Sequence, residues 1–156
     1  MAQVIPPTKI KSFRSAAEFE KWLSKQHDRE TELWLRFFKK DSGRPTVSYA
    51  EALDVVLCWG WIDGIRKAYD EISFLQRYSP RKSKSVWSHI NRENIARLVA
   101  AGRMTEHGQK HVDAAKADAI AVTLRGAAKL CLEEASALPA PAVETDENIA
   151  TVISVN

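Results

Sequence analysis

The segment Glu32–Lys40, with the sequence ELWLRFFKK, constrains the fold most, because its hydrophobic residues alternate with the period of a β-strand. One face carries Leu33, Leu35 and Phe37, and the other carries Trp34, Arg36 and Phe38. Since both faces hold aromatic side chains, we expect a central strand rather than an edge strand. The turn signal Asp41–Gly43 follows it.

Capping-box patterns predict a helix on each side of this strand. Ser15–Glu18 and Ser48–Glu51 each place a serine three residues before a glutamate, so that the serine caps the helix and the glutamate reaches back. The first helix is expected to end near His27 and the second at Gly60, because glycine often follows a helix. The apolar stripe of the first helix consists of Phe19, Trp22 and Leu23. We expect all three to anchor the core.

Beyond Gly60 the pattern changes from helical to extended. Residues 61–67 and 72–78 are predicted to pair as a hairpin. Three helical segments follow: 91–102 with Asn91 as N-cap, 105–118 with Thr105 as cap, and 120–138 with an interruption at Gly126. The predicted fold class is α+β, with a small antiparallel sheet of about three strands, several packed helices and a helical C-terminal part.

Length and composition indicate one domain. The chain has 156 residues, 45% of them hydrophobic and 28% charged, as in ordinary globular proteins. We expect a single domain over residues 1–138 and a disordered or divergent tail over 139–156, where no periodicity is found. Cys58 and Cys131 lack the spacing of a disulfide framework or metal site. We expect no signal peptide and no membrane-spanning segment, because no apolar run of the required length is found. These features predict a cytoplasmic protein.

Charge is distributed unevenly along the chain. Residues 1–125 carry 22 Lys or Arg against 15 Asp or Glu, a net charge of +7, whereas residues 126–156 carry 1 against 5, a net charge of −4. A basic body of this kind favours an anionic partner, such as nucleic acid. Shielding of the body by the acidic tail is the simpler alternative.

Aromatic and cationic residues are interleaved from Cys58 to Asn91. Between Arg77 and Arg92 there are five Arg or Lys residues and no acidic residue. We therefore predict a surface that contacts an unknown anionic ligand or a protein partner, with nucleic acid as an alternative. The candidate contact residues are Asp63, Arg77, Arg81, Lys82, Lys84, Ser85, Trp87 and Asn91. The competing interpretation is a solvated loop, with Arg77 paired across the hairpin.

The aromatic residues and the carboxylate of this stretch have two interpretations each. Trp59 and Trp61 favour a role in the core, because tryptophan buries a large area, whereas Trp87 beside the cations is the better contact residue. Asp63 is either a carboxylate with a raised pKa that handles protons, or a turn cap or ion-pair partner; the second is favoured.

No catalytic residue, metal site or cofactor is predicted. The sequence contains the residue types of a cysteine–histidine–aspartate catalytic set, in Cys58, His89 and Asp63, but it does not show that they lie close together. A buried, inert thiol is the favoured interpretation of Cys58. His107 and His111 are spaced four residues apart on a predicted helix, but no third ligand of a zinc motif accompanies them. The oligomeric state is not predicted.

Two motifs carry a resemblance to a known family: GWIDG at residues 60–64 and PRKSKSVWSHIN at residues 80–91. Further matching positions are Phe13, Phe19, Trp22, Leu23, Glu32–Leu35, Lys39, Lys40, Tyr49–Ala52, Tyr78, Ser79, Gly102–Met104 and Gly108. On these positions, residues 10–118 resemble the YdeI/OmpD-associated family, also called bacteriocin-protection proteins. The chain departs from that pattern at residues 119–121, and residues 123–156 hold no counterpart of the family's helical C-terminal module.

The resemblance implies a non-enzymatic protein that protects against bacteriocins or cationic antimicrobial peptides and is linked to an outer-membrane porin. Two alternatives come from the residues: a nucleic-acid-binding module using residues 77–92, and an enzyme acting on a small anionic substrate with Asp63 and nearby cations. Salt-dependent retention on a polyanion would favour the first alternative. A pocket enclosing Asp63, Arg81 and Trp87 would favour the second.

Overall fold

The computed structural model describes residues 4–137, and the predicted tail at 139–156 therefore lies outside the described residues. The chain divides into two units, residues 1–118 and residues 119–156. The sheet, the core and the candidate site all belong to the first unit. Of the second unit, the described part is the C-terminal stretch of one helix, α4.

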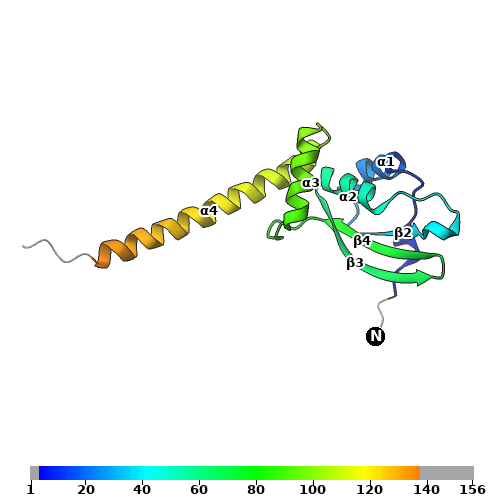
Figure 1. Ribbon diagram of the computed structural model, residues 1–156, viewed down its shortest axis with the longest axis horizontal. Helices are drawn as coiled ribbons and strands as arrows, with labels where there is room; N and C mark the ends of the chain where they lie inside the picture. The colour runs from blue at the N-terminus through cyan, green and yellow to red at the C-terminus, as the bar shows by residue number, and fades with distance from the viewer. Residues whose placement is uncertain (1–3, 138–156) are drawn as a thin grey trace, which may run out of the picture. The chain divides into compact units, whose positions relative to one another are not determined.

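A four-stranded sheet forms the centre of the first unit (Figure 1). Its strands are β1 (Ile10–Lys11), β2 (Leu33–Phe38), β3 (Trp61–Asp70) and β4 (Ser73–Pro80), in the order β1-β2-β4-β3. The β2–β4 and β3–β4 pairs are antiparallel, but β1 runs parallel to β2. The α+β class is confirmed. The sheet differs from the expected antiparallel sheet of about three strands by the short parallel strand β1, which has only two residues and no alternation by which a sequence could reveal it.

The central position predicted for β2 is confirmed, because β1 and β4 flank it. Its residues alternate between the two faces as predicted: Leu35 is fully buried in the core, and Trp34 lies on the opposite face. Trp34 is nonetheless only 3% exposed, and the ammonium group of Lys67 lies 5.3 Å from its ring centroid. Both faces of β2 are therefore shielded from solvent.

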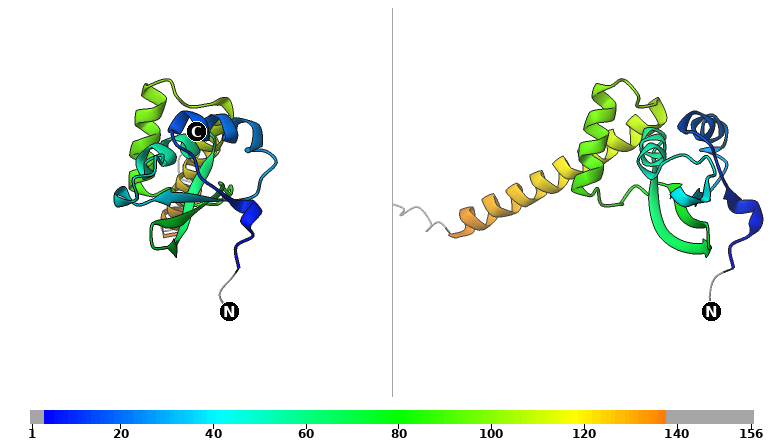
Figure 2. Two further views of the ribbon diagram at one scale, coloured as in Figure 1. Left: turned by 90° about the vertical axis from the view of Figure 1, so that its right-hand side faces the viewer. Right: turned by 45° about the vertical axis from the view of Figure 1, so that its right-hand side comes forward.

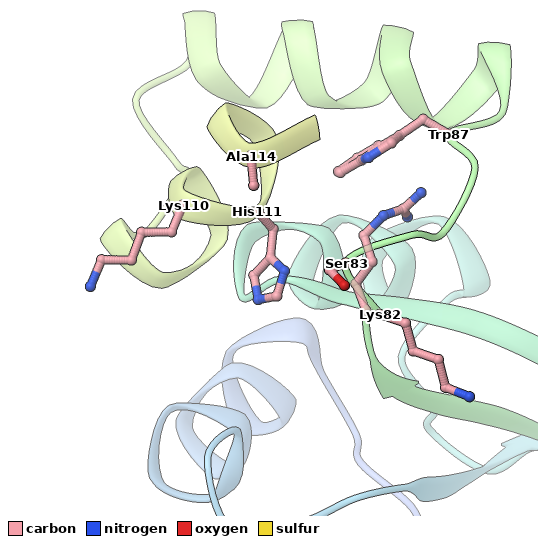
Figure 3. A pocket seen from close by; sticks show the side chains of 7 residues that line it. Lys82, Ser83, Trp87, Lys110, His111 and Ala114 are labelled. Carbon is pink, nitrogen blue, oxygen red and sulfur yellow. The ribbon is translucent and has the colours of Figure 1, made fainter. Parts of the chain in front are cut away.

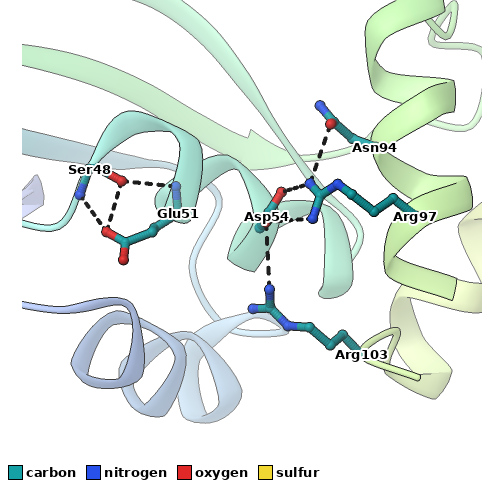
Figure 4. Close-up of polar contacts among 6 residues, drawn as sticks. All are labelled: Ser48, Glu51, Asp54, Asn94, Arg97 and Arg103. Atoms are coloured by element: carbon teal, nitrogen blue, oxygen red, sulfur yellow. Dashed lines mark hydrogen bonds and ion pairs between the residues drawn. The ribbon is translucent and has the colours of Figure 1, made fainter. Parts of the chain in front are cut away.

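Helices α1 (Ala16–Gln26) and α2 (Tyr49–Cys58) lie on the same side of the sheet (Figures 1 and 2). Both predicted N-caps are present. At Ser48 the complete capping box forms, since Ser48 and Glu51 each accept a hydrogen bond from the other's backbone N–H (Figure 4). At Ser15 only half of it forms, because the Glu18 carboxylate accepts from the N–H of Arg14 instead. Short 3₁₀ turns occupy Pro7–Lys9 and Lys40–Ser42.

Helices α3 (His89–Ala100) and α4 (Glu106–Ala137) differ from the prediction in two respects. Ser88 is the N-cap of α3, and Asn91, which we expected in that role, is buried in the first turn. Residues 106–137 form one helix where two were expected, with no break at Gly126. Glycine costs a helix about 1 kcal/mol but keeps its backbone hydrogen bonds, so it need not interrupt the helix. Thr105 caps α4 as predicted, accepting a hydrogen bond from the N–H of Gly108.

The core of the first unit lies between the sheet and its helices. Its fully buried large side chains include Phe19, Leu23, Leu33, Leu35, Leu57, Trp61, Tyr78 and Leu98. Trp61 is the core residue we expected, with its indole N–H donating to the carbonyl of His27. Trp22 and Trp59 are only half-buried against this core, less than we expected.

Two contacts fix α3 and the start of α4 against α2. The carboxylate of Asp54 on α2 accepts two hydrogen bonds from Arg97 on α3, at 2.6 and 3.1 Å, and pairs with Arg103 in the following loop (Figure 4). Gly108 of α4 lies directly on the carbonyl group of Cys58, where an added Cβ would be 2.1 Å from the oxygen. Among the described residues, no helix is both long enough and apolar enough to span a membrane.

Candidate anion-binding site

The candidate site begins where β4 ends. After Pro80, the N–H of Arg81 donates to the carbonyl of Gly60, and the chain then leaves the sheet as a loop that leads to α3. Pro80 lacks an N–H and the serines of this loop favour turns, so the irregular backbone is expected from the sequence. The hydrogen bond to Gly60 holds the base of the loop against the junction of α2 and β3.

Arg81 is the unusual residue of this loop, because its side chain is buried. Only 5% of the residue is exposed, and its guanidinium group stacks on Trp87 with 3.5 Å between Cζ and the ring centroid. Nη2 donates to the carbonyl of Val86 at 2.9 Å, but Nε and Nη1 are buried with no hydrogen-bond partner among the described residues. Burial lowers the pKa of Arg81, and the negative charge of Asp63 partly offsets this.

A cavity of about 250 Å³ opens beside this guanidinium group, between the loop and α4 (Figure 3). It is lined by Arg81, Lys82, Ser83, Trp87, Lys110, His111 and Ala114. Three of these side chains are cationic, one is a histidine, and none is a carboxylate. All seven belong to the first unit. The cavity is therefore a concave site of positive charge with an aromatic wall.

His111 enters this cavity from α4 next to a glycine. A Cβ on Gly60 would lie 2.4 Å from Cδ2 of the imidazole, so only glycine leaves room for the ring, and its φ of +73° also favours glycine. Burial, followed by the charge of Arg81, lowers the pKa of His111. The ring of His107 lies 5.2 Å away, and the ring of His27 at the end of α1 lies 4.6 Å beyond that. The neutral form of His111 is therefore favoured.

The sequence of this unit matches one known family. The model of a domain of unknown function, DUF8412, matches residues 11–111, which include the loop and reach His111. The chain belongs to the DUF8412 family. No curated protein and no solved structure matches it.

The DUF8412 fold brings only part of the predicted contact set together. Arg81, Lys82 and Trp87 line the cavity, whereas Lys84 and Ser85 belong to the same loop but do not line it. Arg77 donates to the Glu32 carboxylate at 2.9 Å, so the alternative of a paired arginine is the correct one, although its partner precedes β2 rather than lying across the hairpin.

The carboxylate of Asp63 is also hydrogen-bonded to another residue of the protein. Its carboxylate accepts a hydrogen bond of 2.7 Å from the hydroxyl of Tyr49 on α2, and it is not one of the cavity residues. Burial, reinforced by this hydrogen bond, raises the pKa of Tyr49 to about 12. The hydroxyl of neighbouring Tyr78 is buried without a partner among the described residues, and burial raises its pKa too.

The sequence did not predict that residues of α4 form one wall of the cavity. Lys110, His111 and Ala114 lie about 30 residues beyond the loop, and nothing in the sequence shows that α4 returns to it. The spacing of these residues, at i, i+1 and i+4, places them on one helical face. The tight contact between Gly108 and the carbonyl of Cys58 brings that face to the loop. A single glycine in a sequence is not enough to predict such a contact.

The cysteine–histidine–aspartate set is not assembled. Cys58 is fully buried, and burial raises the pKa of its thiol to about 11, as expected of an inert cysteine. His89 is exposed and lies 3.5 Å from Glu93. Among the side chains that the structure describes, in residues 4–133, no group of three His, Cys, Asp or Glu is arranged to hold a metal ion.

Proposed function

We propose that this protein binds a small ligand through an anionic group, of the phosphate or carboxylate class, in the cavity beside Arg81. The observation that carries this is the pair of buried, unpartnered donors on Arg81, Nε and Nη1. The two donors lie on different edges of the planar guanidinium group, because Nη1 is on the Cδ side and the Nε–H points to the other side. Each therefore lacks an acceptor of its own, which an oxygen of an anion can supply.

The energetics of burial support this assignment. A charged group that is buried without a partner destabilises a fold, and a missing hydrogen bond to it adds to the cost. Arg81 is held in such a position by its stacking on Trp87 and its hydrogen bond to Val86. An anion in the cavity would supply the missing negative charge and an acceptor for a donor that it reaches.

The remaining cavity residues fit an anion of small size. Lys82 and Lys110 add positive charge, and in Figure 3 their ammonium groups point outward, away from Trp87, on flexible stems that allow them to approach a ligand. A volume of about 250 Å³ lies below the usual range of about 300–1,000 Å³ for pockets that enclose drug-sized ligands. Trp87 offers a flat apolar wall for the rest of the molecule.

Binding without catalysis is the favoured activity. The carboxylate of Asp63, on which an enzymatic role would rest, is bonded to Tyr49 and does not line the cavity. Among the lining residues there is one histidine, His111, and neither a carboxylate nor a second histidine accompanies it.

The motifs resembling the YdeI/OmpD-associated family add a biological proposal, protection against bacteriocins or cationic antimicrobial peptides. The positive charges of this cavity would repel a cationic peptide. We therefore propose that the protein protects by binding an anionic ligand or partner and not by binding the peptide itself. Deletion of the gene should then sensitise the bacterium to such peptides, and a copy carrying both Lys82→Gln and Lys110→Gln should not restore resistance. Full restoration by that copy would separate the protective role from the cavity.

The binding proposal is tested with inorganic phosphate and two neighbouring lysines. We expect the indole signal of Trp87 in the NMR spectrum to shift on titration with phosphate, at ionic strength held constant with chloride. Lys82→Gln should weaken binding by about two- to fivefold, because it removes an exposed charge from the cavity. Lys84→Gln, in the same loop but outside the cavity, should leave binding unchanged.

Two results would overturn the proposal. One is the absence of any phosphate-dependent shift in the wild-type protein. The other is an equal effect of both lysine variants, together with equal losses of salt-dependent retention on heparin. That outcome would favour the nucleic-acid-binding alternative, in which the cations act as an extended surface.

A further inference from the structure

We propose that His111 is an anion-binding residue of this cavity and takes up a proton when the anion binds, so that affinity rises as the pH falls. This inference rests on the proposed function of the same site. It assigns a role to a residue that the sequence motifs do not single out as a binding residue, and it makes binding sensitive to pH near neutrality.

The position of His111 supports a direct role. The imidazole lines the cavity together with Arg81 and Ser83, on the opposite wall from the loop (Figure 3). The contact with Gly60 restricts the ring, since the glycine leaves just enough space beside Cδ2. A restricted ring loses little conformational freedom when it donates a hydrogen bond to a ligand.

Burial and the charge of Arg81 favour the neutral form of His111 in the absence of an anion. Arg81 faces it from the loop, and it adjoins Lys110 on its own helix; Lys82 is a further cation of the cavity. On its other side lies His107, next to His27 from α1. Asp28, which follows α1, acts on His107 in the opposite direction and raises its pKa. No acidic side chain lines the cavity to stabilise an imidazolium ion there.

An anion reverses this balance. A negative charge within hydrogen-bonding distance favours the protonated imidazole and raises its pKa, whereas burial and the charge of Arg81 lower it in the free protein. Protonated imidazole donates from both ring nitrogens, and neutral imidazole from one. Because the bound state holds the proton more tightly than the free state, protons and anion must favour each other's binding.

Sulfate is the suitable probe, because it stays a dianion over the pH range in which histidine titrates. We expect the affinity of the wild-type protein for sulfate to rise by about tenfold between about pH 8 and about pH 5.5, the effect of a pKa shift of about one unit. Calorimetric titrations in two buffers of different ionisation enthalpy should show net proton uptake on binding.

His111→Gln should bind sulfate more weakly than the wild type and lose most of the pH dependence, because glutamine donates a hydrogen bond but does not titrate. His89→Gln is the matched control, since this histidine is exposed and outside the cavity, and should behave as the wild type. Far-UV circular dichroism at each pH establishes that the variants are folded.

The outcomes separate this inference from the proposed function. Absence of sulfate and phosphate binding at every pH would overturn both. Binding with an affinity that does not change with pH, or a pH dependence that His111→Gln leaves intact, would overturn the role of His111 alone. In the second case His107→Gln shows whether the neighbouring ring is the group that titrates.

Discussion

At the scale of single residues, Arg81 shows how the fold changes the meaning of a charged loop. From the sequence we expected Arg81, Lys82 and Lys84 to be exposed, so that changing all three to glutamine would hardly affect stability. The exposure expected of Arg81 is wrong, because its side chain is buried against Trp87. Of the charges replaced in that set, only Lys82 and Lys84 are exposed.

Replacing Arg81 by methionine separates stability from binding. Methionine keeps an apolar stem on Trp87 and removes the buried charge, and such replacements are often neutral or stabilising. We expect Arg81→Met to change the free energy of unfolding by less than about 1 kcal/mol and to abolish phosphate binding. Urea unfolding and NMR titration measure the two effects. A loss of about 3 kcal/mol or more would show that Arg81 is retained for its contacts in the fold.

The aromatic residues of α1 allow a comparison of buried and half-buried side chains. Phe19 is fully buried, with its ring 4.9 Å from that of Phe13, whereas Trp22 lies at the edge of the same cluster with Lys11 over its ring. Phe19→Ala should cost about 3–5 kcal/mol in chemical denaturation, the usual range for a buried aromatic residue. Trp22→Ala should cost clearly less. Equal losses would mean that Trp22 is as much a core residue as Phe19.

At the scale of elements, α4 depends on one glycine for its position and tolerates another. Gly108 contacts the carbonyl of Cys58 at the end of α2, and Gly126 has no neighbouring atom within 4 Å. Both lie in the same helix, and alanine is the better helix former at both by about 1 kcal/mol. The difference between them is therefore a difference in packing alone.

This pair of glycines gives a controlled test of that packing. Gly108→Ala should destabilise the protein by about 1–3 kcal/mol, because the new Cβ meets rigid backbone, and it should also weaken phosphate binding by displacing the α4 wall. Gly126→Ala should leave binding unchanged and increase helicity. Thermal unfolding and circular dichroism at 222 nm provide the measurements. A neutral Gly108→Ala would indicate that α4 shifts easily at this contact.

At the scale of the whole first unit, three histidines connect α1, α4 and the cavity. His107 lies between His27 and His111, and burial, followed by the charges of these neighbours and of Lys110, lowers its pKa. The folded state therefore prefers the neutral ring. Its contribution to stability is present above the unfolded pKa of about 6.5 and is lost as the pH falls toward the lower, folded-state pKa.

We expect the melting temperature of the ligand-free protein to fall by a few degrees between about pH 7 and about pH 5.5, before most carboxylates titrate. His107→Gln should reduce this dependence, since glutamine carries no charge at any pH, and His89→Gln should not. Differential scanning calorimetry across the range measures the effect. A melting temperature that rises on acidification would show that the charged histidines are stabilised in the fold.

Local patterns determined much of this protein. Three local patterns act through neighbours within four residues: the alternation of Leu33–Phe38, the serines before α1 and α2, and the glycine at position 60. From these patterns the sequence alone predicted the central strand, two helices and the α+β class. The cations and Trp87 of the loop also pointed to the candidate site, because their residue types favour contact with an anion wherever the loop lies.

Tertiary structure decided which of these residues belong together. The parallel pairing of β1, the partner of Arg77, the burial of Arg81 and the approach of His111 all join segments that are far apart in the chain. Such contacts depend on how whole elements pack. The residue type alone does not show whether a side chain is exposed to water, paired with an ion or lining a cavity. The sequence therefore showed which chemical groups the loop contains, whereas only the tertiary structure showed how these groups are arranged.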